Sequence, residues 1–87
     1  MRIKDTIIIN KINDEYVLID SDTSKNRFNG LIKLNEESKN IIELLHNDIS
    51  FDELINKMLD IYEVDKDILE NDVKSLIDKL NKTGIIV

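Results

Sequence analysis

The sequence predicts an α+β domain of the winged helix-turn-helix type, with a three-stranded antiparallel sheet followed by three helices. Before Leu34, short runs of β-branched residues alternate with polar turn residues, whereas after Leu34 apolar residues recur at every third or fourth position. Strands that are segregated from helices in this way favour α+β layers. The short link at Glu63-Val64 between the second and third helices permits a helix-turn-helix. With 87 residues, the chain has the length of one domain, 1–87.

Three strands are expected in the first part of the chain. Residues 6–12 are rich in isoleucine and stop at Asn13-Asp14, a pair that favours a tight hairpin turn into a second strand at residues 15–20. A polar loop over residues 21–26 precedes the third strand, residues 27–34. Gly30 lies inside that strand, which indicates either a bulge or the close approach of another backbone.

Capping residues mark the starts of the three helices. Asn35 is expected to cap the first helix, and Asp65 the third. Ser50 and Glu53 have the spacing of a capping box at the start of the second helix. Gly84 is the expected end of the third helix, because glycine readily adopts the left-handed conformation found there.

The charge distribution argues against nucleic-acid binding. The net charge is −6, and residues 35–87 carry six Lys and Arg against thirteen Asp and Glu, a net charge of −7. The third helix, which would be the recognition helix, begins with four carboxylates and one lysine in residues 65–72. Carboxylates there would repel a phosphate backbone. The acidic charge either suits a basic peptide or protein surface as partner or serves only to keep the protein soluble.

The residues that catalysis or cofactor binding needs are scarce. The chain has no cysteine, and its two glycines, Gly30 and Gly84, are too far apart for a phosphate-binding loop. The single histidine, His46, is explained by its place near the end of the first helix, where a cation is favourable. We therefore expect no enzymatic activity, no cofactor and no metal. The lack of a signal peptide or an apolar run of membrane-spanning length predicts a cytoplasmic protein.

Three segments in order resemble the PqqD-like family, the recognition elements for ribosomally synthesised and post-translationally modified peptides (RiPPs). They are residues 15–20, residues 30–45 with the junction Leu34-Asn35, and residues 72–86. The sequence departs from the family in two ways. Residues 21–29 are longer than the usual turn and lack its common proline, and the tryptophan and cysteine of some pyrroloquinoline-quinone pathway members are absent.

The resemblance implies that the chain binds the leader of a precursor peptide. In the family, the leader adds as a strand between the third strand and the third helix, an example of β-augmentation. It is then presented to a modifying enzyme, such as a radical-SAM enzyme, or to a leader peptidase. The chain is similar in length to the stand-alone leader-binding proteins of lasso-peptide clusters, so the resemblance is compatible with a lasso-peptide cluster or a radical-SAM cluster. Asp72 and Lys79 are candidates for contacts with charged groups of the leader. The full set of implied peptide-binding residues is Gly30, Leu31, Ile32, Lys33, Leu34, Leu69, Asp72, Val73, Leu76 and Lys79.

Two other classes of function are also compatible with the sequence. One is a winged-helix transcriptional regulator, and the other is a small protein-interaction or oligomerisation module whose sheet edge pairs with a second copy.

Overall fold

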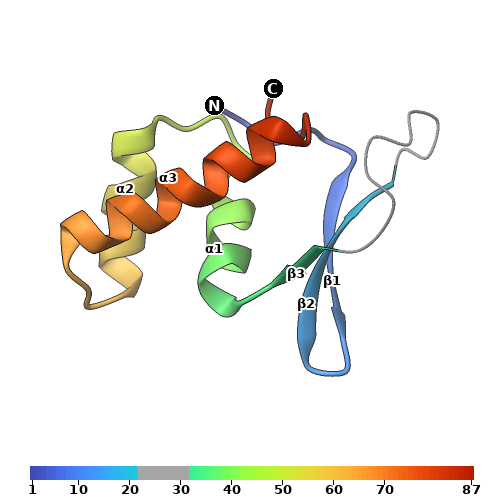
Figure 1. Ribbon diagram of the computed structural model, residues 1–87, viewed down its shortest axis with the longest axis horizontal. Helices are drawn as coiled ribbons and strands as arrows, with labels where there is room; N and C mark the ends of the chain where they lie inside the picture. Colours follow the sequence, from blue (N-terminus) through green and yellow to red (C-terminus); the bar gives the residue numbers. More distant parts are fainter. Residues whose placement is uncertain (22–31) are drawn as a thin grey trace.

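The computed structural model describes residues 1–21 and 32–87. The described strands β1 (Ile7–Ile12), β2 (Glu15–Asp20) and β3 (Ile32–Leu34) form an antiparallel sheet in the order β1-β2-β3. The helices that follow are α1 (Glu36–Leu44), α2 (Phe51–Ile61) and α3 (Lys66–Lys82) (Figure 1). The predicted α+β class and the order of strands before helices are thus confirmed. Residues 27–31 of the predicted third strand lie outside the described residues.

The β1–β2 hairpin closes through Asn13 and Asp14, as the sequence predicts. Both residues have positive φ angles, 50° and 64°, in the left-handed region. Asn and Asp tolerate this conformation better than most residues, and two such residues give a turn whose twist matches the strands. The register that results pairs Ile12 with Glu15 and continues to Ile7 and Asp20.

The predicted caps begin all three helices. The Asn35 side chain accepts a 2.7 Å hydrogen bond from the Ser38 amide. Ser50 and Glu53 form the reciprocal capping box, and Asp65 accepts hydrogen bonds from two amides in the first turn of α3. Each cap satisfies amide donors that a helix start leaves without partners. These starts are therefore determined by local sequence.

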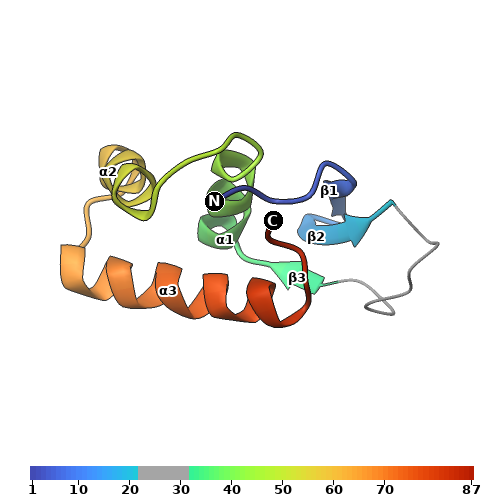
Figure 2. The ribbon, with the colours of Figure 1, turned by 90° about the horizontal axis from the view of Figure 1, so that it is seen from above.

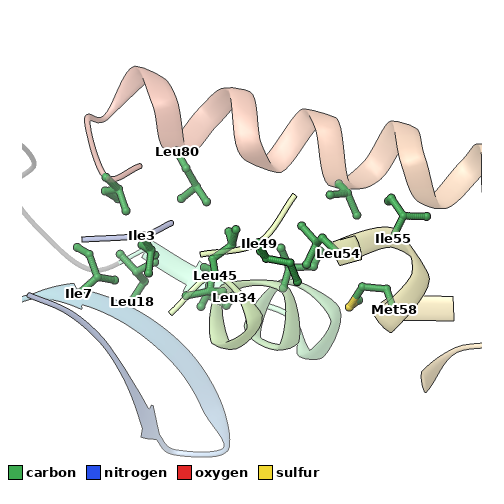
Figure 3. Packing of buried hydrophobic residues seen from close by; sticks show 14 of the residues in the cluster. Ile3, Ile7, Leu18, Leu34, Leu45, Ile49, Leu54, Ile55, Met58 and Leu80 are labelled. Atoms are coloured by element: carbon green, nitrogen blue, oxygen red, sulfur yellow. The ribbon is translucent and has the colours of Figure 1, made fainter. Parts of the chain in front are cut away.

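The core is built where the sheet meets the helices. Buried apolar side chains come from β1, β2, β3 and from each helix, and residues before β1 and after α3 add to them. In Figure 3, Ile7 and Leu18 lie at the sheet end of this cluster, and Ile55 and Met58 lie at the α2 end. The buried side of α3 carries Leu80, toward the sheet end. This arrangement holds the helices in fixed positions relative to the sheet.

The two terminal segments pair with each other. Ile3 and Ile86 form an isolated antiparallel bridge, and the Val87 amide donates a 2.8 Å hydrogen bond to the Arg2 carbonyl. The N and C labels lie close together in both views (Figures 1 and 2). The extended segment after Gly84, whose φ is 74°, is therefore paired with residues 2–4 and is not added to the edge of the sheet.

Candidate functional site

The first component of the site is the outer edge of β3. In antiparallel sheets, directly opposed residues alternate between hydrogen-bonded and non-hydrogen-bonded pairs. The Ser21 amide donates a 2.8 Å hydrogen bond to the Thr6 carbonyl, which fixes the phase of this alternation in the β1–β2 ladder. Val17 therefore directs its peptide groups toward β1. Its neighbours Tyr16 and Leu18 direct theirs toward β3.

The same alternation decides which part of β3 faces outward. Tyr16 is paired with Leu34, and Leu18 with Ile32, so these two β3 residues direct their peptide groups toward β2. The N–H and C=O of Lys33 consequently point away from the sheet. In the described part of the chain no strand pairs with that side of β3. An extended peptide can therefore form main-chain hydrogen bonds at Lys33.

The second component is a groove of about 290 Å³ between the start of α1 and the middle of α3. It adjoins the sheet edge directly, because Asn35, one of its lining residues, follows the last residue of β3. Figure 2 shows α3 running past α1, with β3 at the sheet end of the molecule. The groove is lined by Asn35, Glu37, Ser38, Ile41, Asp72, Ser75, Leu76 and Lys79.

Helical periodicity places the α3 residues of the groove on one face. Asp72, Ser75, Leu76 and Lys79 are separated by three, one and three positions, so they form a continuous stripe along the helix. The adjacent stripe is buried and anchors α3 to the core. The groove therefore has a rigid wall, since the helix that carries it is held by its own buried face. The residues of the buried stripe are Leu69, Val73 and Leu80.

Three charged side chains line the groove: Glu37, Asp72 and Lys79. Within residues 1–21 and 32–87, the ion pairs found do not include Glu37, Asp72 or Lys79. Asp72 and Lys79 are exposed, and Glu37 is half-buried. Asn35 also lines the groove, but its side-chain oxygen already accepts a hydrogen bond from the Ser38 amide. Among the described residues, these three side chains are therefore available to pair with charged groups of a ligand.

The structure separates the residues that the sequence implied into four groups. Asp72, Leu76 and Lys79 meet in the groove. Ile32 and Lys33 lie on the edge strand, half-buried and exposed respectively. Gly30 and Leu31 lie outside the described residues. A last group points into the core and is 8 %, 2 % and 0 % exposed: Leu34, Leu69 and Val73.

Five groove residues are missing from the set implied by the sequence. Ser75 has a recognisable signal, because it is three positions from Asp72 and shares the face of Leu76. The other four surround the start of α1, which follows the edge strand immediately. Three of them already have a role in the cap and first turn of α1, and Ile41 has one in the core, so the sequence carries no separate signal that they line the groove. These four are Asn35, Glu37, Ser38 and Ile41.

His46 is accounted for by the fold. Its Nε2 atom lies 3.2 Å from the Ile7 carbonyl oxygen, which ties the end of α1 to β1. Over the described ranges, no three His, Cys, Asp or Glu side chains are grouped in a way that could hold a metal ion. Nor does any helix in residues 1–21 or 32–87 have the length and apolar character needed to cross a bilayer.

Two solved structures share this fold. One is described as TbiB1 in complex with the TbiA(beta) leader peptide; it has a TM-score of 0.73 and 24 % sequence identity, covering 98 % of this chain and 93 % of that chain. The other is described as lasso peptide synthetase B1 complexed with the leader peptide, with a TM-score of 0.70, 21 % identity, and coverage of 97 % and 93 %.

The family of the chain follows from its sequence. No curated protein matches the chain. The family model described as "Coenzyme PQQ synthesis protein D (PqqD)" matches residues 15–86, which include β2, β3, all three helices and every residue of the groove. This match extends over most of the sequence and agrees with the resemblance inferred from its ordered segments. The chain therefore belongs to the PqqD family.

Proposed function

We propose that this protein binds the leader of a RiPP precursor peptide as an additional strand on the outer edge of β3. The observation that carries the proposal is the outward-facing N–H and C=O of Lys33, on an edge that adjoins the groove. An exposed strand edge supplies main-chain hydrogen bonds, and a neighbouring pocket supplies selectivity for side chains. Membership of the PqqD family, and the leader peptides in the descriptions of two solved structures with this fold, support it.

The proposed contacts differ in kind along the site. Lys33 contributes its main chain, and Leu76 contributes apolar surface in the groove. Asp72 gives the lining a negative charge and Lys79 gives it a positive charge at the other end of the α3 stripe. The buried residues Leu34, Leu69 and Val73 act indirectly, by holding β3 and α3 in place. A leader that is disordered when free loses conformational entropy on docking, so strand pairing and groove contacts together must offset that cost.

The role of this protein is to present the leader to the enzyme that acts on the precursor peptide. A domain that holds the leader and contacts a modifying enzyme or a leader peptidase raises the local concentration of substrate at that enzyme's active site. The chemistry itself belongs to the partner enzyme. The alternative of a transcriptional regulator is not favoured, because exposed Asp65 and Asp67 stand at the start of α3, where a duplex would have to approach.

The test is a fluorescence-polarisation titration with the labelled leader of the precursor peptide encoded beside the gene. A saturable isotherm is expected, and a scrambled peptide of the same composition should not compete. Amide hydrogen exchange gives a second readout, in which the Lys33 N–H becomes protected when leader is added. The proposal is abandoned if no leader binding is seen either alone or with the candidate modifying enzyme present.

A further inference from the structure

The charges of the groove are arranged in a defined order. Asp72 and Lys79 are seven positions apart on α3, which places Lys79 about 10.5 Å further along the helix axis at 1.5 Å per residue. Glu37 reaches the groove from the first turn of α1. Two carboxylates and one ammonium thus line the same groove, and in the part of the chain that the structure describes none of them has an ion-pair partner.

The rest of the lining suits a long side chain with a charged end. Leu76 is half-buried and offers apolar surface at the groove, whereas Ile41 is 1 % exposed and offers almost none. Lysine and arginine cover such surface with their methylene stems while the charged end stays near water or a partner. The hydroxyls of Ser38 and Ser75 add hydrogen-bond acceptors for the charged end.

The sign of the occupant's charge follows from the electrostatics. The lining has a net charge of −1, counting Glu37, Asp72 and Lys79. Residues 35–87, which form the helical part of the molecule, have a net charge of −7. Both net charges are negative, so they attract a cation and repel a carboxylate.

We infer that the groove selects leaders that carry a lysine or arginine, with its stem over Leu76 and its charge held by Asp72 together with Glu37. This inference rests on the proposed function and adds a chemical class of leader to it. Lys79, at the other end of the stripe, directs the cation toward the Asp72 end of the groove. Because these groups are partly solvated, the pairing contributes selectivity more than affinity.

The experiment is a charge-reversal cycle in the same polarisation assay, at low and at physiological salt. The probe is the synthetic leader encoded beside the gene and a set of variants in which each Lys or Arg is replaced singly by Glu. Asp72→Asn should weaken binding of the unaltered leader by about 2- to 5-fold, the range of an exposed ion pair, and Asp72→Lys by more. One leader variant should regain affinity for the Asp72→Lys protein, giving a non-additive coupling.

Two further variants fix the sign and the location of the effect. Lys79→Gln should tighten binding at low salt, because the groove becomes more negative, and added salt should reduce the gain. Asp78→Asn is the matched control: Asp78 is an exposed carboxylate on α3 that does not line the groove, so binding should be unchanged.

The possible outcomes separate this inference from the function on which it rests. If the wild-type protein binds no leader, both are overturned. If it binds a leader that has no basic residue, or if no leader variant couples to Asp72, only the charge selectivity is overturned. Tighter binding by Asp72→Asn together with weaker binding by Lys79→Gln would show instead that the groove accepts an acidic side chain.

Discussion

Proline at Lys33 tests the proposed strand addition at a single hydrogen-bond donor. Proline removes the backbone N–H, and it is tolerated in sheets only on an edge whose N–H faces away from the neighbouring strand. The register places Lys33 in that position. Lys33→Pro should therefore leave the β2–β3 ladder intact while it removes a donor that the leader needs. Ile32→Pro, in contrast, would remove an N–H directed toward β2 and should destabilise the protein itself.

The expected loss can be estimated from one hydrogen bond. Removing the donor leaves a leader carbonyl without its partner at a partly buried contact, which costs about 1–3 kcal/mol. At 1.36 kcal/mol for each factor of ten, the dissociation constant should rise by about 5- to 150-fold. The Lys33 side chain contributes little to this, because its 3.4 Å ion pair with Glu15 joins two exposed groups.

The assay compares Lys33→Pro with Lys33→Ala, which removes the side chain and keeps the N–H. Leader affinity is measured by fluorescence polarisation, and folding by circular dichroism and thermal denaturation. We expect Lys33→Ala to bind within about fivefold of the wild type, since an exposed ion pair is worth at most about 1 kcal/mol and most are worth less. Full affinity in a folded Lys33→Pro protein would refute strand addition at this edge and place the leader elsewhere.

The remaining predictions concern the groove, a helix cap and one titrating group. Leu76→Ala should weaken leader binding with little loss of stability because Leu76 is only half-buried, whereas Leu80→Ala, at a site 2 % exposed, should cost about 2–5 kcal/mol in urea denaturation. Ser50→Ala breaks the capping box and should cost about 0.5–2 kcal/mol in the same measurement. The 2.9 Å hydrogen bond from the Met1 ammonium lowers the pKa of the Asp48 carboxyl below its ordinary 3.8. Ionised Asp48 therefore stabilises the folded state at pH values above 3.8, and this stabilisation is lost as the pH falls through the lowered pKa. An NMR titration should show the pKa of Asp48 rising when the amino group is acetylated.

The local sequence was sufficient to predict the structure wherever a few neighbouring residues determine the backbone geometry. Asn13 and Asp14 adopt the left-handed conformation that a two-residue hairpin needs. Ser50 and Glu53 satisfy the first amides of α2, and Gly84 takes the positive φ that follows α3. In each case the responsible atoms lie within about four residues of one another, so the pattern can be interpreted without knowledge of the fold.

The residues of the candidate site could not all be predicted from local sequence patterns. Asp72, Leu76 and Lys79 follow from the family resemblance, but the opposite wall of the groove comes from the start of α1, about 35 positions earlier in the chain. Whether a residue such as Val73 points into the core or into the groove depends on how α3 is rotated about its axis. That rotation is set by packing against the sheet and the other helices, which no short segment specifies.

The sequence by itself determined the order of the elements, the caps of the helices, the acidic character of the helical part and the resemblance to the PqqD family. Only the tertiary structure decided that Lys33, and not Ile32, has its N–H on the free side of β3, and that Glu37 and Asp72 share one groove. The physical reason is that both facts depend on relations between distant segments. The phase of strand pairing fixes which amides face outward, and the packing of α3 against the core fixes which helix face lines the groove.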